Sequence, residues 1–265
     1  MKISLKLNFT RHANAGKANA GDHDRSRRIS KKGKRQSAEL RHLLGHDYRP
    51  DLVLVSPLLR IRDTAEEIFG VEGYEKIPVI SLPELFRHPN AARQARIDEM
   101  WNEFGYRSLR EYRAKYGTDA DLLVDLGRIA AAQIRTIATA FLHDLEDPVV
   151  HVIGHAVILP AVMFAVVEDE QFLDLNMTEC CTVSVEFNDD DAPKIKVMYI
   201  PEVRESVQPE RESLTDEEKI GHEPDDLQGT DLRHSATRVI QTDEGDLRPV
   251  GRPDVSGDQY ALAFK

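Results

Sequence analysis

Cysteine is scarce in this chain of 265 residues, and its two cysteines, Cys180 and Cys181, are adjacent. Adjacent cysteines are poorly placed to bridge each other, and they lack the spacing of metal ligands. The sequence therefore offers no disulfide framework and no structural metal site. We expect two buried, reduced thiols, as in a cytoplasmic protein, and neither is a predicted nucleophile.

Long apolar runs are also absent, and so is the apolar block of a signal peptide near residue 1. Without such a run, neither a membrane helix nor a secretory signal is expected, and we predict no membrane partner. Hydrophobic residues nevertheless make up 41% of the chain. That fraction is enough for a full-sized buried core.

An excess of basic residues is the third absence, because the net charge is −11. Residues 201–265 hold 16 acidic and 8 basic side chains, so most of the negative charge lies there. This composition predicts no nucleic-acid partner. It also predicts one domain over residues 1–200, followed by an acidic tail of low order over 201–265, which we regard as a candidate contact for an unknown protein.

What the sequence does contain is an alternation of short apolar runs with helical patterns. Strands are predicted over residues 3–9, 51–55, 78–82 and 149–153, with a closing pair over 182–187 and 195–200. Helices are predicted over 32–44, 57–69, 119–142 and 158–167, the first of them with Ala38, Leu40, Leu43 and Leu44 facing inward. Residues 86–118 interrupt the alternation and predict a helical insert. The fold class is α/β, a three-layer α/β/α sandwich around a mostly parallel sheet.

The first candidate for chemistry is Arg11-His12, directly after the first predicted strand. Ligands of open α/β sheets bind beyond the carboxyl ends of strands. A histidine there can act as a nucleophile, and an arginine can hold a phosphoryl oxygen. Taken alone, the pair is more simply interpreted as a strand end at the surface.

Two further strand ends supply partners. The run from Ser56 to Glu66 leaves a strand and enters a helix, where an arginine such as Arg60 favours an anion. The alternative is that Arg60 and Arg62 are solvated helix residues, one of them pairing with Glu66. His155 follows a third buried strand and Gly154. Because parallel strands end at one edge, the sequence predicts two histidines and two arginines there.

Such a set is suited to phosphoryl transfer. His12 would attack phosphorus, Arg11 and Arg60 would neutralise the phosphoryl oxygens, and His155 would stabilise the equatorial oxygens. An alkoxide leaving group needs an acid, and Glu84 after the third strand is the best-placed carboxyl group in the sequence. The alternative for Glu84 is a surface glutamate in a loop.

These motifs together resemble the signatures of the histidine phosphatase superfamily, which has the phosphoglycerate-mutase-like fold. They are Arg11-His12-Ala13, the Ser-Pro-Leu-Leu-Arg run from Ser56, Leu82-Pro83-Glu84 and Gly154-His155. The resemblance covers roughly residues 1–200. It implies a phosphohistidine intermediate on His12, hydrolysis without a metal or other cofactor, a phosphate pocket of Arg11, Arg60 and His155, and Glu84 as catalytic proton donor. The Arg-His-Ala start resembles the phosphohistidine phosphatase subgroup in particular.

Two alternatives stay open at this point. The substrate is either a phosphohistidine protein or a small phosphomonoester, since the 86–118 insert is longer than the subgroup pattern and would cap the pocket if it lies nearby. A different class of protein, a catalytically silent phosphate-binding regulatory module with the tail as its interaction element, would carry the same residues.

Overall fold

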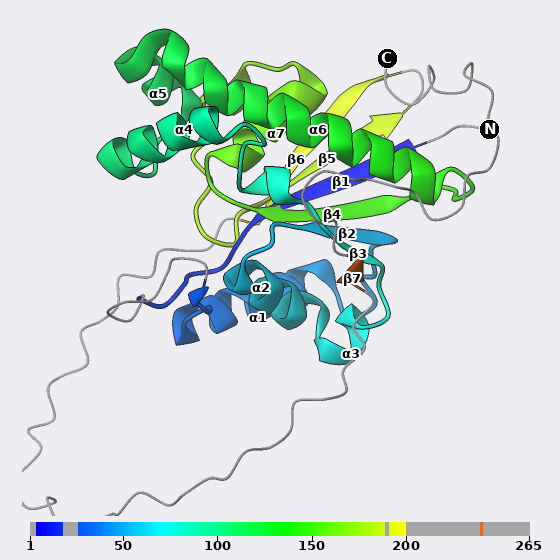
Figure 1. Ribbon diagram of the computed structural model, residues 1–265. Helices are drawn as coiled ribbons and strands as arrows, with labels where there is room; N and C mark the ends of the chain where they lie inside the picture. Colours follow the sequence, from blue (N-terminus) through cyan, green and yellow to red (C-terminus); the bar gives the residue numbers. More distant parts are fainter. Residues whose placement is uncertain (1–3, 18–25, 189–190, 200–238, 241–265) are drawn as a thin grey trace, which may run out of the picture. The chain divides into compact units, whose positions relative to one another are not determined.

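The computed structural model describes residues 4–17, 26–188, 191–199 and 239–240 (Figure 1). The predicted acidic tail lies outside the described residues, except for Val239–Ile240. The strands are β1 (Ser4–Arg11), β2 (Leu52–Val55), β3 (Val79–Ser81), β4 (Val149–Gly154), β5 (Thr182–Asn188), β6 (Asp191–Tyr199) and β7 (Val239–Ile240). The α-helices are α1 (Lys31–Leu44), α2 (Leu59–Phe69), α3 (Val71–Tyr74), α4 (Ala91–Phe104), α5 (Leu109–Tyr116), α6 (Asp121–Leu142), α7 (Ile158–Val167) and α8 (Gln171–Asp174). The 3₁₀ turns η2 (Pro83–Leu85) and η3 (Gly117–Ala120) follow β3 and α5.

The strands form one sheet in the order β6-β5-β1-β4-β2-β3-β7. β1, β4, β2 and β3 run parallel to one another, while β5 and β6 form an antiparallel edge. In the register, Arg11 is opposite Gly154, and Val55 is opposite both Ile153 and Ser81. The residues that follow β1, β4, β2 and β3 therefore emerge side by side at one edge.

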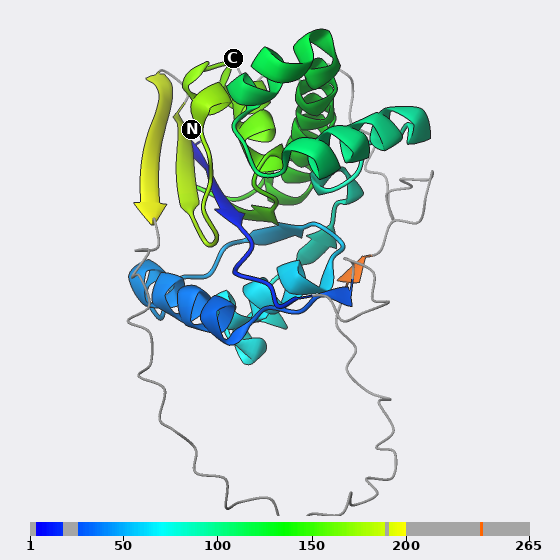
Figure 2. The ribbon, with the colours of Figure 1, turned by 90° about the vertical axis from the view of Figure 1, so that its left-hand side faces the viewer.

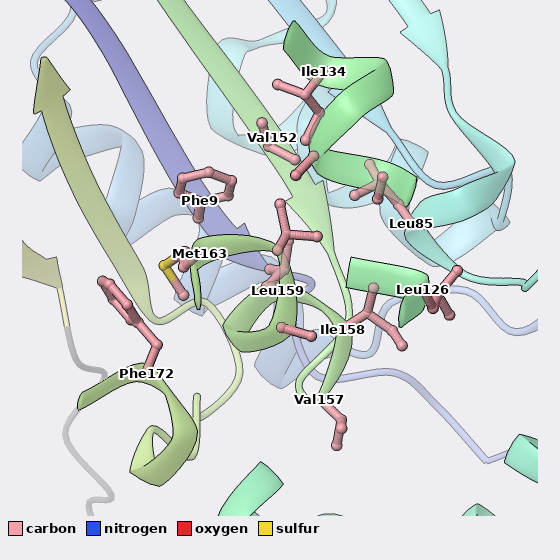
Figure 3. Close-up of a cluster of buried hydrophobic side chains, with 14 of the residues drawn as sticks. Phe9, Leu85, Leu126, Ile134, Val152, Val157, Ile158, Leu159, Met163 and Phe172 are labelled. Atoms are coloured by element: carbon pink, nitrogen blue, oxygen red, sulfur yellow. The ribbon is translucent and has the colours of Figure 1, made fainter. Parts of the chain in front are cut away.

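Helices cover both faces of this sheet, as the two ribbon views show. α4, α5, α6 and α7 lie on one face, and α1, α2 and α3 lie on the other (Figures 1 and 2). Each face has its own buried hydrophobic cluster. Figure 3 shows part of the larger one, in which Phe9 and Val152 of the sheet lie beside Leu159 and Met163 of α7. The predicted three-layer sandwich with a mostly parallel sheet is confirmed.

The packing of α6 on α7 depends on Gly127. A Cβ atom at this position would lie 2.5 Å from the backbone carbon of Ala161. Only glycine allows the two helices to approach so closely. This contact holds α7, which begins shortly after His155, close to α6.

The helix predicted over 32–44 is confirmed, with Ser30 as its N-cap and Gly45 as its C-cap. Its predicted inward face was partly wrong, because Ala38 and Leu43 are exposed. Gln36 and Ser37 are buried instead. The reason is that Gln36 Oε1 accepts a hydrogen bond from the backbone N–H of Asn14, just beyond β1. α1 therefore supports the loop after His12 with polar side chains.

Candidate active site

Arg11 and His12 leave β1 under tight backbone control. Arg11 N–H donates to the Cys181 carbonyl at 3.1 Å, and His12 N–H donates to the Gly154 carbonyl at 3.0 Å. The buried, free cysteines thus lie directly beside the Arg11 backbone, and burial raises the pKa of Cys180 to about 12 and of Cys181 to about 11. The prediction of buried thiols is confirmed, and neither sulfur is a thiolate nucleophile at neutral pH.

The His12 ring is held in one tautomer. Its Nδ1 lies 2.7 Å from the Ala13 carbonyl oxygen, which can only accept, so Nδ1 carries the hydrogen. Burial lowers the pKa of His12 to about 3, and the neighbouring charges of Arg60, Arg11 and Arg27 act in the same direction. The imidazole is therefore neutral at physiological pH, with the lone pair of Nε2 available for attack.

Arg60 lies in the first turn of α2 and is buried, whereas Arg62 is exposed and pairs with Glu66. This separates the two alternatives left open by the sequence. Thr64 connects the helix to the loop after β1, since its hydroxyl donates to the Arg60 carbonyl and accepts from the Ala13 N–H. The start of α2 and the segment after His12 are thereby fixed to each other.

His155 follows β4 and is oriented by Ser56. Its Nε2 lies 3.0 Å from the Ser56 hydroxyl, and both residues are buried. Burial lowers the pKa of His155 well below its usual value, with further lowering from His12, Arg60 and Arg11. His155 is therefore neutral as well.

The structure brings the predicted nucleophile His12 together with the three predicted phosphate-pocket residues, Arg11, Arg60 and His155. The rings of His12 and His155 are 5.2 Å apart at their centroids, and the charges of Arg11 and Arg60 act on both. Relative exposure is only 8% for Arg11, 4% for His12, 4% for Arg60 and 6% for His155. Among the described residues, Arg11 has no carboxylate within ion-pair distance, and its Nε is buried without a hydrogen-bond partner. A buried cation of this kind suits a small anion.

Arg27 is a residue that the sequence did not single out. Its Nε donates to the Gly16 carbonyl at 2.8 Å, and its positive charge helps to lower the pKa of His12. Residues 28–30 pair with 14–16 through Gly16 N–H to Arg28 O and an isolated bridge between Ala15 and Ile29. The sequence signal that could have pointed to it is the basic run Arg25-Ser26-Arg27-Arg28, which contains it.

The 86–118 insert contributes two aromatic rings to this region. The Arg11 guanidinium lies 4.6 Å from the ring centroid of Tyr106, in the loop between α4 and α5. The Phe86 ring is 5.2 Å from that of His155. The insert therefore contacts two of the phosphate-pocket residues, in keeping with a covering element.

Glu84 stands apart from the other four. It lies in η2 on the segment after β3 and is half-buried. Phe86, two residues further, contacts His155, so this segment reaches the site. Within the described part of the chain, however, no hydrogen bond or ion pair joins the Glu84 carboxylate to either imidazole or either arginine.

A separate cavity of about 470 Å³ lies along α1 and α2 and contains none of the predicted site residues. Its charged lining is largely paired, with Arg28 bound to Asp63 and Lys34 to Glu67. This pairing leaves little attraction for a phosphate.

Residues 7–200 match the sequence profile of the histidine phosphatase superfamily (branch 1). The chain belongs to the histidine phosphatase superfamily. The resemblance drawn from the motifs is thereby confirmed. No curated protein matches the chain.

Solved structures of the histidine phosphatase fold are similar to this chain. A phosphoglycerate mutase from Bacillus anthracis is 15% identical over 74% of this chain and 93% of its own, with a TM-score of 0.53. A phosphoserine phosphatase from Entamoeba histolytica, in complex with 3-phosphoglyceric acid, is 14% identical over 72% and 95%, with a TM-score of 0.50. A protein from Agrobacterium tumefaciens assigned as the phosphohistidine phosphatase SixA is 16% identical over 74% and 98%, with a TM-score of 0.47. Because these sequence identities are low, the similarity to these structures shows a shared fold only.

None of the helices among the described residues is both long enough and apolar enough to cross a bilayer.

Proposed function

We propose that this protein is a phosphatase that works through a phosphohistidine on His12. The observation that carries the proposal is the pairing of two buried neutral imidazoles with two buried guanidiniums. Nε2 of His12 would attack phosphorus in line, and the P–O bond to the leaving group would break. Water would then attack the phosphohistidine, releasing inorganic phosphate and restoring neutral His12.

The remaining groups divide the work of charge stabilisation. Arg11 and Arg60 neutralise the phosphoryl oxygens, and His155 donates to an oxygen whose charge grows in the transition state. Arg27 adds a third positive charge near His12 and favours the arrival of an anion. Glu84 is proposed as the proton donor to the leaving group. Its carboxyl would reach the site once substrate is bound, because catalytic contacts are often long without substrate.

A small phosphomonoester is the substrate we favour over a phosphohistidine protein. The Tyr106 ring packs against the Arg11 guanidinium. The side chains of the two arginines and two histidines of the site are at most 8% exposed. A compact phosphoester reaches such a depth more readily than a side chain fixed on a folded protein. We also propose that the protein acts in the cytoplasm and needs no metal.

Hydrolysis by the purified protein tests this proposal. The panel would include para-nitrophenyl phosphate, glycerol phosphate and a phosphohistidine peptide, each with wild type and His12→Ala, in the presence of a chelator. We expect phosphate release from the small esters, faster than from the peptide, and its loss in His12→Ala.

The silent phosphate-binding module makes a different prediction for the same samples. If no substrate is hydrolysed while phosphate or vanadate still raises the melting temperature, that second function replaces the phosphatase. Equal hydrolysis by wild type and His12→Ala would overturn the proposed mechanism.

A further inference from the structure

The hydrogen bond between Ser56 and His155 joins residues that are 99 positions apart in the sequence. Ser56 directly follows the last residue of β2 and precedes Pro57. Its exposure is 1%. Its backbone N–H donates to the Ile153 carbonyl at 3.2 Å, which fixes Ser56 against the end of β4. The serine hydroxyl is thus built into the sheet edge from which His155 emerges.

This bond leaves one nitrogen of His155 for a ligand. Ser56 occupies Nε2, and the described contacts of His155 place no hydrogen bond on Nδ1. A neutral imidazole carries one hydrogen, either on Nε2 or on Nδ1. If Nε2 carried it, Nδ1 would hold only a lone pair and could not donate to an anion.

We propose that Ser56 is a positioning residue that donates its hydroxyl hydrogen to Nε2 of His155 and so holds His155 as the Nδ1–H tautomer. Nδ1–H is then the donor to the phosphoryl oxygen. Both imidazoles of the site then take the Nδ1–H tautomer, but they present different nitrogens to the phosphoryl group. Ala13 O keeps the hydrogen of His12 on Nδ1 and frees Nε2 for attack, whereas Ser56 directs the hydrogen of His155 toward the phosphoryl group. The catalytic part of this inference rests on the proposed phosphatase function.

Neutral His155 makes the tautomer matter. Burial and the nearby positive charges keep His155 uncharged, so it cannot offer hydrogens from both nitrogens at once. A donor placed without reorganisation stabilises the transition state more than the bound substrate. Loss of Ser56 should consequently lower kcat more than it changes KM.

The tautomer itself is measurable without activity. Long-range ¹H–¹⁵N correlation spectra of histidine-labelled protein distinguish Nδ1–H from Nε2–H, and inorganic phosphate serves as the probe ligand. In wild type with phosphate we expect His155 as Nδ1–H and His12 also with its hydrogen on Nδ1. His155 as Nε2–H in that sample would overturn the inference, whatever the enzyme does with substrates.

Variants connect the tautomer to turnover. We expect Ser56→Ala to lower kcat by about 10- to 100-fold with KM changed less than about threefold. Ser56→Thr, which keeps the hydroxyl, should recover most of the loss. Ser184→Ala removes another buried serine hydroxyl from the sheet, on β5, and should leave kcat unchanged.

The outcomes separate this inference from the proposed function. Wild-type kcat in a folded Ser56→Ala protein, or equal losses in the alanine and threonine variants, would contradict the positioning role. Failure of Ser56→Ala to fold leaves the wild-type spectrum and Ser56→Thr as tests. If wild type hydrolyses nothing, the phosphatase proposal fails, and the spectrum still decides the tautomer.

Discussion

At the scale of single residues, the site combines groups that are individually ordinary. A strand-end histidine, a helical arginine and a buried serine each have a structural explanation when taken alone. Their combination is unusual, because two guanidiniums and two neutral imidazoles share one buried volume. Guanidiniums are suited to binding phosphoryl oxygens, so this combination of groups supports the proposed phosphoryl ligand.

Glu84 gives a prediction at this scale. If it protonates the leaving group, Glu84→Gln should slow hydrolysis of glycerol phosphate by about 100-fold, since an alkoxide needs the proton. Hydrolysis of para-nitrophenyl phosphate should change little, because its phenolate leaves unaided. Steady-state rates on the two esters check this, with the exposed Glu72→Gln as control. Equal losses on both esters would remove the acid role.

Much of this residue set could be predicted from the sequence. Arg11, His12 and His155 stand directly after apolar strand patterns, and Arg60 stands in the first turn of a helix that follows a strand. Strand order and register then decide which of them meet. The Ser56 contact to His155 and the Tyr106 contact to Arg11 could not be predicted, because both depend on tertiary packing between residues far apart in the chain.

At the scale of elements, α1 supports the loop that follows His12. Ser30 caps it and also donates to Asn14 Oδ1 at 2.6 Å, while Gln36 accepts from the Asn14 N–H. Hydrophobic periodicity identified the helix but misplaced part of its buried face. Periodicity detects apolar contacts, and this face is polar because it binds backbone groups of a loop. The same polar contacts keep Ala13 in place as the partner of His12.

Gly33 of α1 tests this support. A Cβ atom there would lie 2.2 Å from the Asn14 carbonyl oxygen, so Gly33→Ala must displace the loop or the helix. We expect kcat/KM to fall at least about 10-fold and the free energy of unfolding to fall by about 1–3 kcal/mol. Denaturant melts and initial rates measure both.

The matched control for Gly33→Ala is Gly16→Ala, in the loop after His12 that Gly33 contacts. A Cβ atom at residue 16 meets nothing closer than the Arg28 carbonyl oxygen at 3.8 Å. Its stability should stay within about 0.5 kcal/mol of wild type. Wild-type activity and stability in Gly33→Ala would contradict the supporting role of α1.

At the scale of the whole molecule, burial keeps His12, His151 and His155 neutral. Burial lowers the pKa of His12 and of His151 to about 3, and it lowers that of His155 well below the usual value. His151 bonds to Thr10 and Tyr48 beneath the sheet edge. Each of these imidazoles must gain a proton when the acidified chain unfolds. The site is therefore linked to global stability.

This linkage predicts the response to pH. The unfolded chain binds protons below the ordinary histidine pKa of 6.5 and the folded chain does not until about pH 3. Stability should fall as pH drops below 6.5, by up to about 1.4 kcal/mol per pH unit for each histidine. Urea unfolding between pH 7 and 4 measures the slope.

Variants assign that slope to particular residues. His151→Gln should reduce the number of protons taken up on unfolding by about one, which makes the fall in stability with decreasing pH less steep. Substitution of the exposed His42 by Gln should leave this slope unchanged. A slope that is the same in wild type and His151→Gln would show that His151 is not a source of the acid instability.

The central claim is covalent chemistry at His12, and trapping the intermediate tests it most directly. Rapid mixing with para-nitrophenyl phosphate, an alkaline quench and peptide mass spectrometry would locate the phosphoryl group. The account predicts one phosphoryl group on His12, stable in alkali, lost in acid and absent from His12→Ala. A phosphoryl group on any other residue, or undiminished phosphate release by His12→Ala, would contradict it.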